Sequence, residues 1–223
     1  MSDSRSCVFE ERVRDAIACK EKGNKHFLQG NWTLALEAYR QSLYHVEFEE
    51  LSWNFELLPL HRKTVNKVRV PSHLNVAACV LKCDEASGDL LVEAREACDK
   101  AIKLLDEEEK EDASSDSAAE ELANAMASRS KSKAKALFRR GSIFILLNDS
   151  DNAIRDLKEA ARLAPKNAQI RKAYARAQQS MQEEKLAQSS FWKSALEGKI
   201  LKMSEEVEEK ENENSLLSSC SLS

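Results

Sequence analysis

Small and apolar residues recur at three- and four-residue steps along most of this 223-residue chain, and this periodicity limits its fold more than any other feature. The breaks between periodic stretches are short, because the chain contains only five Gly and three Pro residues. An all-β fold needs many more of these turn-forming residues. The sequence therefore predicts an all-α protein.

Six of the periodic stretches pair into three helical hairpins joined by short polar turns. The expected pairs are residues 10–29 with 32–48, 71–81 with 90–105, and 134–147 with 151–163. The third helix is expected to start near Pro71 and Ser72, since Pro is tolerated at a helix start and Ser caps one. The fifth should extend back towards Glu120, because that stretch is rich in Ala and has no helix breaker.

The remaining segments are expected to connect or flank these hairpins. Residues 1–9 are predicted to be a flexible N-terminus, and residues 50–69 and 107–130 are predicted to be linkers. Pro165 ends the sixth helix and Asn167 can cap a seventh, residues 167–203. Residues 204–223 are acidic and then Ser-rich, which indicates a disordered tail.

The hairpins carry small residues at positions where paired helices nearly touch. The tetratricopeptide repeat (TPR) has small residues at its eighth and twentieth positions and a bulky one at its twenty-fourth. Repeats at about 16–49 and 134–167 match this register, with Gly23, Ala35 and Tyr39 in the first and Gly141, Ala153, Leu157 and Pro165 in the third. The middle repeat, about 70–106, places Ala77 correctly and fits Ala94 and Cys98 only with a longer turn. Residues 10–203 are thus predicted to be a right-handed TPR superhelix with a long C-terminal capping helix, the alternative being an irregular helical bundle.

Four stretches carry a closer resemblance. They are Lys20-Glu21-Lys22-Gly23-Asn24, Ser72-His73-Leu74-Asn75-Val76-Ala77, Glu96-Ala97-Cys98-Asp99-Lys100-Ala101 and Lys135-Ala136-Leu137-Phe138-Arg139-Arg140-Gly141. Together they resemble the TPR domains of immunophilin co-chaperones of the FK506-binding-protein type, over roughly residues 10–200. That group carries an isomerase domain before the repeats, for which this chain has no room. We therefore expect a binding protein and no enzyme.

Five basic and amide residues are placed to line one groove. Lys20 and Asn24 lie one turn apart on the first helix of the first hairpin, Asn75 lies on the third helix, and Lys135 and Arg139 repeat the one-turn spacing on the fifth. Lysines supply compact positive charge, Arg a planar fork and Asn neutral donors, so the set suits a ligand with two carboxylates. Taken singly, each charged residue is more often an ordinary solvated helix residue.

The resemblance gives these five residues a role. In the families that this chain resembles, the matching positions form a carboxylate clamp for the C-terminal Glu-Glu-Val-Asp tail of heat-shock protein 90 or heat-shock protein 70. The expected function is therefore a cytoplasmic co-chaperone or adaptor that binds such a tail. Phe27 is a candidate contact for the Val of the peptide, with burial between the paired helices as the alternative. A TPR fragment of a peptidyl-prolyl isomerase and a scaffold for an unrelated peptide remain alternative functions.

Composition argues against other classes of function. The net charge of −4 gives no global sign of nucleic-acid binding, and no apolar run is long enough for a membrane span. The four His are isolated, and no phosphate-binding loop is present, so neither a catalytic site nor a cofactor is expected. Cys79 and Cys83 lack a second ligand pair at zinc spacing, which favours reduced packing cysteines over a metal site.

The C-terminal part of the chain leaves two questions open. The apolar residues of the seventh helix cap the solenoid or present a surface to a second protein partner; they are Phe191, Trp192, Leu196, Ile200 and Leu201. The run Glu205-Glu206-Val207-Glu208 mimics the expected ligand, so it could compete for the groove, although an acidic solvated run is the simpler interpretation.

Overall fold

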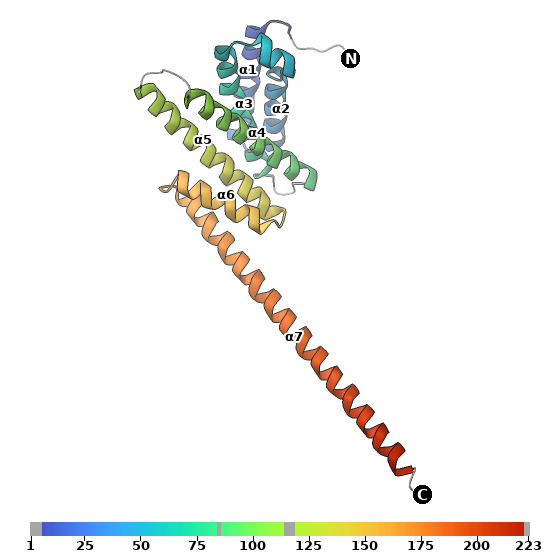
Figure 1. Cartoon of the computed structure of the whole chain (residues 1–223). Helices are drawn as coiled ribbons and strands as arrows, with labels where there is room; N and C mark the ends of the chain where they lie inside the picture. Colours follow the sequence, from blue (N-terminus) through green and yellow to red (C-terminus); the bar gives the residue numbers. More distant parts are fainter. Residues whose placement is uncertain (1–5, 84–85, 114–118, 221–223) are drawn as a thin grey trace. The chain divides into compact units, whose positions relative to one another are not determined.

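A computed structural model describes residues 6–83, 86–113 and 119–220, with the backbone alone given for residues 112, 113, 119, 121, 197, 198 and 200–220. These residues form helices and contain no strand, as the sequence predicts (Figure 1). In chain order the helices are α1 (Phe9–Leu28), α2 (Trp32–His45), the short π-helical η1 (Ser52–Glu56), α3 (Pro59–Val80), α4 (Gly88–Ala113), α5 (Ala119–Leu146), α6 (Ser150–Leu163) and α7 (Ala168–Cys220). Residues 1–177 and 178–223 form two compact units.

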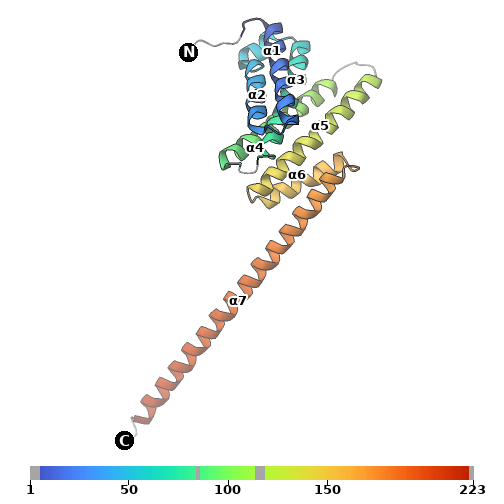
Figure 2. The ribbon, with the colours of Figure 1, turned by 180° about the vertical axis from the view of Figure 1, so that it is seen from behind.

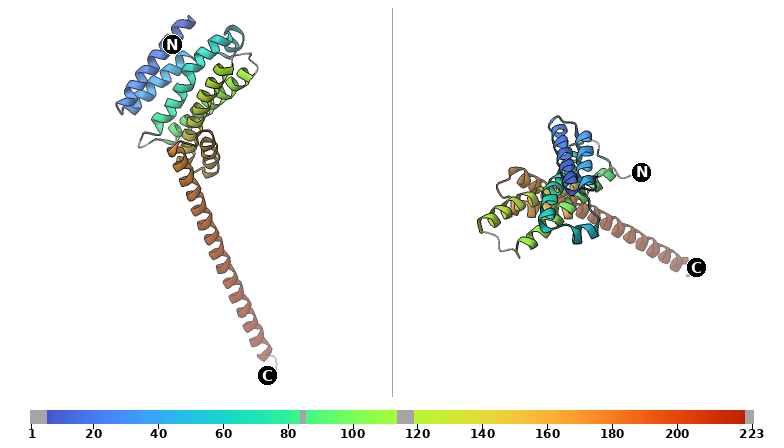
Figure 3. Two further views of the ribbon diagram at one scale, coloured as in Figure 1. Left: turned by 90° about the vertical axis from the view of Figure 1, so that its left-hand side faces the viewer. Right: turned by 90° about the horizontal axis from the view of Figure 1, so that it is seen from above.

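Three hairpins make up most of the first unit, and they follow one another in chain order (Figures 2 and 3). The helices α1 and α2, α3 and α4, and α5 and α6 pack as pairs, and α2 and α4 join each pair to the next. Gly23 and Gly141 are the close-approach points of the first and third pairs. A Cβ on Gly23 would lie 2.7 Å from the Tyr39 ring, and a Cβ on Gly141 would lie 2.8 Å from Cγ of Leu157. The eighth and twenty-fourth repeat positions thus meet, as the register predicts.

The third helix begins earlier than expected. It starts at Pro59, not at Pro71, so most of the predicted linker 50–69 is helical and Pro71 lies inside α3. Pro71 has no N–H to donate to the preceding turn. The helix continues because apolar residues are buried on both sides of it, with Val65 and Val68 in one core cluster and Val70 and Leu74 in another.

The second predicted linker is also shorter than expected. α4 continues to Ala113 and α5 begins at Ala119, so most of residues 107–130 is helical. The expected extension of the fifth helix back towards Glu120 is confirmed. At the next turn, Asp149 caps α6 by accepting a hydrogen bond from the Asn152 backbone N–H at 3.2 Å.

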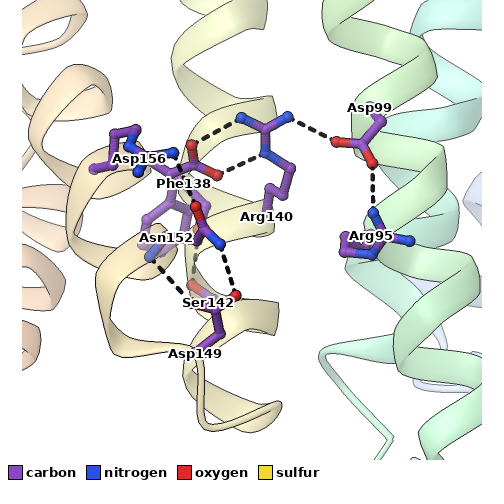
Figure 4. Close-up of polar contacts among 9 residues, drawn as sticks. Arg95, Asp99, Phe138, Arg140, Ser142, Asp149, Asn152 and Asp156 are labelled. Atoms are coloured by element: carbon purple, nitrogen blue, oxygen red, sulfur yellow. Dashed lines mark hydrogen bonds and ion pairs between the residues drawn. The ribbon is translucent and has the colours of Figure 1, made fainter.

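A network of ions joins α4, α5 and α6 (Figure 4). Nε and Nη2 of Arg140 donate to the two carboxylate oxygens of buried Asp156, at 2.6 and 2.8 Å, and Nη1 donates to Asp99 at 2.7 Å. Asp99 also accepts from Arg95 at 3.0 Å. The hydrogen bond to Asp156 raises the pKa of Arg140. Each nitrogen of this guanidinium thus donates a hydrogen bond to a carboxylate of the protein.

The seventh helix starts as predicted and runs further. The Asn167 side chain accepts from the backbone N–H groups of Gln169 and Ile170, which confirms the cap, and Ile170 is buried in a cluster with residues of α5 and α6. The helix continues to Cys220, beyond the expected end at residue 203, because residues 199–220 contain no Pro or Gly. The side chains of Glu205 to Glu208 lie outside the described residues. None of the described helices is long and apolar enough to cross a bilayer.

Candidate functional site

The helices α1, α3 and α5 place the predicted groove residues. α3 packs against both α1 and α5, so one face can draw side chains from all three. The Asn75 side chain on α3 donates from Nδ2 to Oδ1 of Asn24 on α1, at 3.3 Å. Arg139 on α5 donates from Nη1 to the backbone carbonyl of Leu74, the residue before Asn75. The structure therefore brings Asn24, Asn75 and Arg139 together from three hairpins.

Tyr39 orients the Asn24 amide, a role that its repeat position does not predict. Its hydroxyl donates to Oδ1 of Asn24 at 2.7 Å. Burial raises the pKa of Tyr39 to about 12, so the phenol keeps its proton and remains a donor at neutral pH. Because Oδ1 of Asn24 already accepts from Tyr39 and Asn75, its Nδ2 group is the part of the amide left to donate to a ligand. The third repeat has Leu157 at the same, twenty-fourth position. The presence of a Tyr there in the first repeat was therefore the sequence signal that could have indicated the hydrogen bond to Asn24.

Arg139 is a half-buried cation without a carboxylate partner among the described residues. Burial lowers its pKa, while Cys98, Cys79 and Tyr39 lie close enough to influence it electrostatically. Its guanidinium donates a hydrogen bond to the neutral carbonyl of Leu74. A buried charge is costly unless it is paired, and the next residue, Arg140, has two carboxylates (Figure 4). This contrast marks Arg139 as the position where an anion from outside would complete the site.

The two lysines lie on α1 and α5, on the same helices as Asn24 and Arg139. Lys135 is exposed and Lys20 half-buried, and neither has an ion pair or hydrogen bond with another residue that the structure describes. Each lies one helical turn from its neighbour in the set, Lys20 from Asn24 and Lys135 from Arg139. Both ammonium groups are therefore available to an acidic ligand.

The other candidate residues have structural surroundings. Phe27 packs on the main core cluster and contacts the Trp32 ring edge-on, with centroids 4.9 Å apart. Cys79 and Cys98 are buried, which raises the pKa of each thiol to about 12. His73 is buried beside Lys100 and Arg69, and burial is the main cause that lowers its pKa to about 3. No group of three or more His, Cys, Asp or Glu suited to a metal occurs within the described part of the chain.

Comparison with known proteins identifies the fold. The chain is 28% identical over 158 residues to the rat peptidyl-prolyl cis-trans isomerase FKBP4 and 26% identical over 161 residues to the Drosophila melanogaster FK506-binding protein 59. Each match covers 71% of this chain and 27% of the relative, so the chain spans about a quarter of the length of these proteins. The C-terminal TPR domain of a Plasmodium falciparum FK506-binding protein superposes with a TM-score of 0.57 at 20% identity, covering 80% of this chain and 95% of that domain. No protein family model matches the chain.

These matches confirm the resemblance. The chain has the TPR fold, and in sequence it matches the TPR region of FK506-binding-protein-type immunophilins. This fold agrees with the prediction from the repeat register, which was a right-handed superhelix of three hairpins with a long C-terminal helix.

Proposed function

We propose that this chain is a cytosolic co-chaperone or adaptor module whose groove binds the free C-terminal carboxylate of an acidic chaperone tail. The observation that carries the proposal is the half-buried Arg139, which lacks a carboxylate partner among the described residues and lies beside the paired amides of Asn24 and Asn75. A terminal Asp carries two carboxylates, one on its side chain and one at the chain end. Arg139 with Lys135, and Lys20 with the two amides, supply two sets of donors for them.

The identity of the partner follows from the family resemblance. The matching positions of related TPR domains bind the Glu-Glu-Val-Asp end of heat-shock protein 90 or 70, and these five residues provide the same chemistry. Three or four charge-assisted hydrogen bonds contribute about 1.5–3 kcal/mol each, offset by the ordering of a flexible peptide. We expect a Kd of about 1 μM.

Calorimetry with the peptide Met-Glu-Glu-Val-Asp tests this proposal on the full chain. The free acid should bind, and the same peptide amidated at its C-terminus should bind at least about tenfold more weakly, because one charged acceptor is lost. Lys135→Ala should weaken binding of the free acid to a similar degree. Lys158→Ala, which removes an exposed lysine from α6, is the matched control and should leave the Kd unchanged. Equal binding of the acid and the amide, or binding of neither, would refute the clamp.

A second candidate function rests on the name of the rat relative, which is a peptidyl-prolyl cis-trans isomerase. The matched region makes up 27% of the relative and corresponds here to TPR hairpins. We expect no isomerase activity from these 223 residues in a proline-isomerisation assay. Measurable catalysis by the purified chain would favour the enzyme over the adaptor.

A further inference from the structure

The connection between α2 and α3 presents an apolar surface that lies apart from the clamp. Residues 49–60, the acidic–apolar loop, include four large apolar side chains that are 62–82% exposed: Leu51, Phe55, Leu58 and Leu60. Single exposed apolar residues are common on protein surfaces, whereas several together mark an interaction surface. Leu60 lies about 22 Å from Asn75 along α3, at 1.5 Å per residue, so the loop and the clamp are separate sites.

The acidic–apolar loop is anchored from its inner side. Trp53 packs on a core cluster of α1 and α3 residues. Its ring centroid lies 6.4 Å from that of Phe48 and 4.8 Å from the guanidinium carbon of Arg69. The Leu57 backbone N–H donates to the Ser52 carbonyl at 3.0 Å, which closes the π-helical turn. Packing on the core therefore explains Trp53 and does not account for the exposed apolar side chains.

The charge of the acidic–apolar loop indicates what kind of partner covers it. The loop contains Glu49, Glu50 and Glu56 and no Lys, Arg or His. All three carboxylates are exposed, and none has a hydrogen bond or ion pair with another residue that the structure describes. The cations that follow in the chain are Arg62, which is half-buried, and Lys63, which already interacts within the chain. The loop thus complements a partner that combines apolar side chains with Lys or Arg.

We propose that the acidic–apolar loop binds a basic amphipathic segment of a partner protein. Phe55 and the three leucines contact the apolar face of that segment, and the three glutamates pair with the Lys or Arg residues beside it. The site is independent of the clamp, so one chain can hold both ligands at once.

Two other occupants fit the acidic–apolar loop less well. The membrane surface that faces the cytosol carries negative charge, which the three carboxylates repel. In a symmetric dimer the same patch of each copy meets its counterpart, so the three carboxylates of one copy would face those of the other.

Fluorescence anisotropy of a labelled basic amphipathic peptide tests this proposal on the full chain. The probe is a 14-residue peptide of Leu and Lys, with Leu at the spacing of one helical face, and its acidic analogue has Glu in place of Lys. The wild-type chain should bind the basic peptide, and the acidic analogue at least about tenfold more weakly. Phe55→Ser/Leu58→Ser should weaken binding of the basic peptide about tenfold or more. Leu28→Ser/Leu34→Ser replaces two exposed leucines of α1 and α2, and this matched control should leave the Kd unchanged.

A charge variant separates the glutamates from the apolar contacts. Glu49→Gln/Glu50→Gln/Glu56→Gln should weaken binding of the basic peptide about three- to tenfold at low salt. This difference should shrink at high salt, because exposed charges are screened. Far-UV circular dichroism and the urea midpoint of each variant should match those of the wild type, since the replaced side chains are exposed.

Four results would overturn the proposal. The first is that the wild-type chain binds neither peptide, and the second is equal binding of the basic peptide by the wild type and Phe55→Ser/Leu58→Ser. Co-sedimentation with phosphatidylserine vesicles that this variant loses would instead assign the loop to a membrane surface. A dimer that the variant dissociates would assign it to self-association. Failure of the chain to bind Met-Glu-Glu-Val-Asp would refute the clamp and leave the loop assignment untouched.

Discussion

Replacing Gly141 by Ala tests the close approach of α5 and α6. The added Cβ would lie 2.8 Å from Cγ of Leu157 and 3.2 Å from the carbonyl oxygen of Ala153. Carbon atoms in favourable contact are about 3.5–4.0 Å apart, so Leu157 would have to move by roughly 1 Å. Leu157 and Ala153 are both fully buried, which leaves little space for that movement.

The expected loss follows from two opposing terms. Overpacking a close-packed core costs about 1–3 kcal/mol. Ala is favoured over Gly inside a helix by about 1 kcal/mol, which offsets part of that cost. Because both the Leu157 side chain and a backbone oxygen are too close, we expect Gly141→Ala to lower the free energy of unfolding by about 1–2 kcal/mol.

Urea unfolding followed by far-UV circular dichroism measures this difference. Gly88→Ala is the matched control, because Gly88 lies in α4 and a Cβ there would meet no heavy atom within 4 Å. That variant should be as stable as the wild type, or more stable by up to about 1 kcal/mol. If Gly141→Ala raised the free energy of unfolding as much as Gly88→Ala does, this result would contradict the close contact between α5 and α6.

Three further substitutions probe other parts of the first unit. Asp156→Ala leaves the partly buried Arg140 with one carboxylate, so the free energy of unfolding should fall by about 2–3 kcal/mol, and an unchanged urea midpoint would contradict this. His73 has a folded-state pKa of about 3, below its unfolded value of about 6.5, so the unfolded chain binds the extra proton and stability falls as pH drops from 6.5 towards 3. At pH 5 this contribution amounts to about 2 kcal/mol relative to pH 7.5, and His73→Gln should lack it; equal pH dependence of the two urea midpoints would refute the assignment. Tyr39→Phe removes the donor that orients Asn24, so the affinity for Met-Glu-Glu-Val-Asp should fall about three- to tenfold in calorimetry, while an unchanged Kd would show that the hydroxyl has no part in binding.

The repeat register was the most predictable part of the fold. Gly23 and Gly141 identify the points of closest approach, because Gly is the residue that lets two helices come nearer than side chains allow. The turn at Gly30, which has a φ of +79°, and the cap at Asn167 are likewise local features with strong residue preferences. Each of these depends on residues that are neighbours in the sequence or occupy a repeat position.

The start of α3 was not predictable in the same way. Pro59 and Pro71 are both acceptable helix starts, and local preference favours neither. Which of the two prolines begins the helix depends on the burial of Val65 and Val68 against α1 and Val46. This is a tertiary contact, and the periodicity of one short stretch of sequence does not reveal it. The helical extension of α3 that results lines one side of a cavity of about 470 Å³, which residues of α4 and α5 also line.

For the candidate site, the sequence shows the spacing of the proposed residues and not their electrostatic surroundings. The one-turn spacings of Lys20 with Asn24 and of Lys135 with Arg139 are visible in the sequence. The sequence does not distinguish Arg139 from Arg140, although one is paired with carboxylates and the other has none among the described residues. That difference arises because adjacent helical residues point about 100° apart, so they meet different neighbouring helices.

The origin of the groove residues in three hairpins has a consequence for folding cooperativity. In the first unit α1 packs on α2 and α3, while α5 packs on α3, α4 and α6. Each hairpin is therefore stabilised mainly by its contacts with the adjacent hairpin. Such an array can lose a terminal hairpin while the rest stays folded. A ligand held by α1, α3 and α5 at once binds only when all three hairpins are folded, and its binding free energy therefore opposes partial unfolding at either end. Peptide binding should thus make the unfolding of the array more nearly two-state.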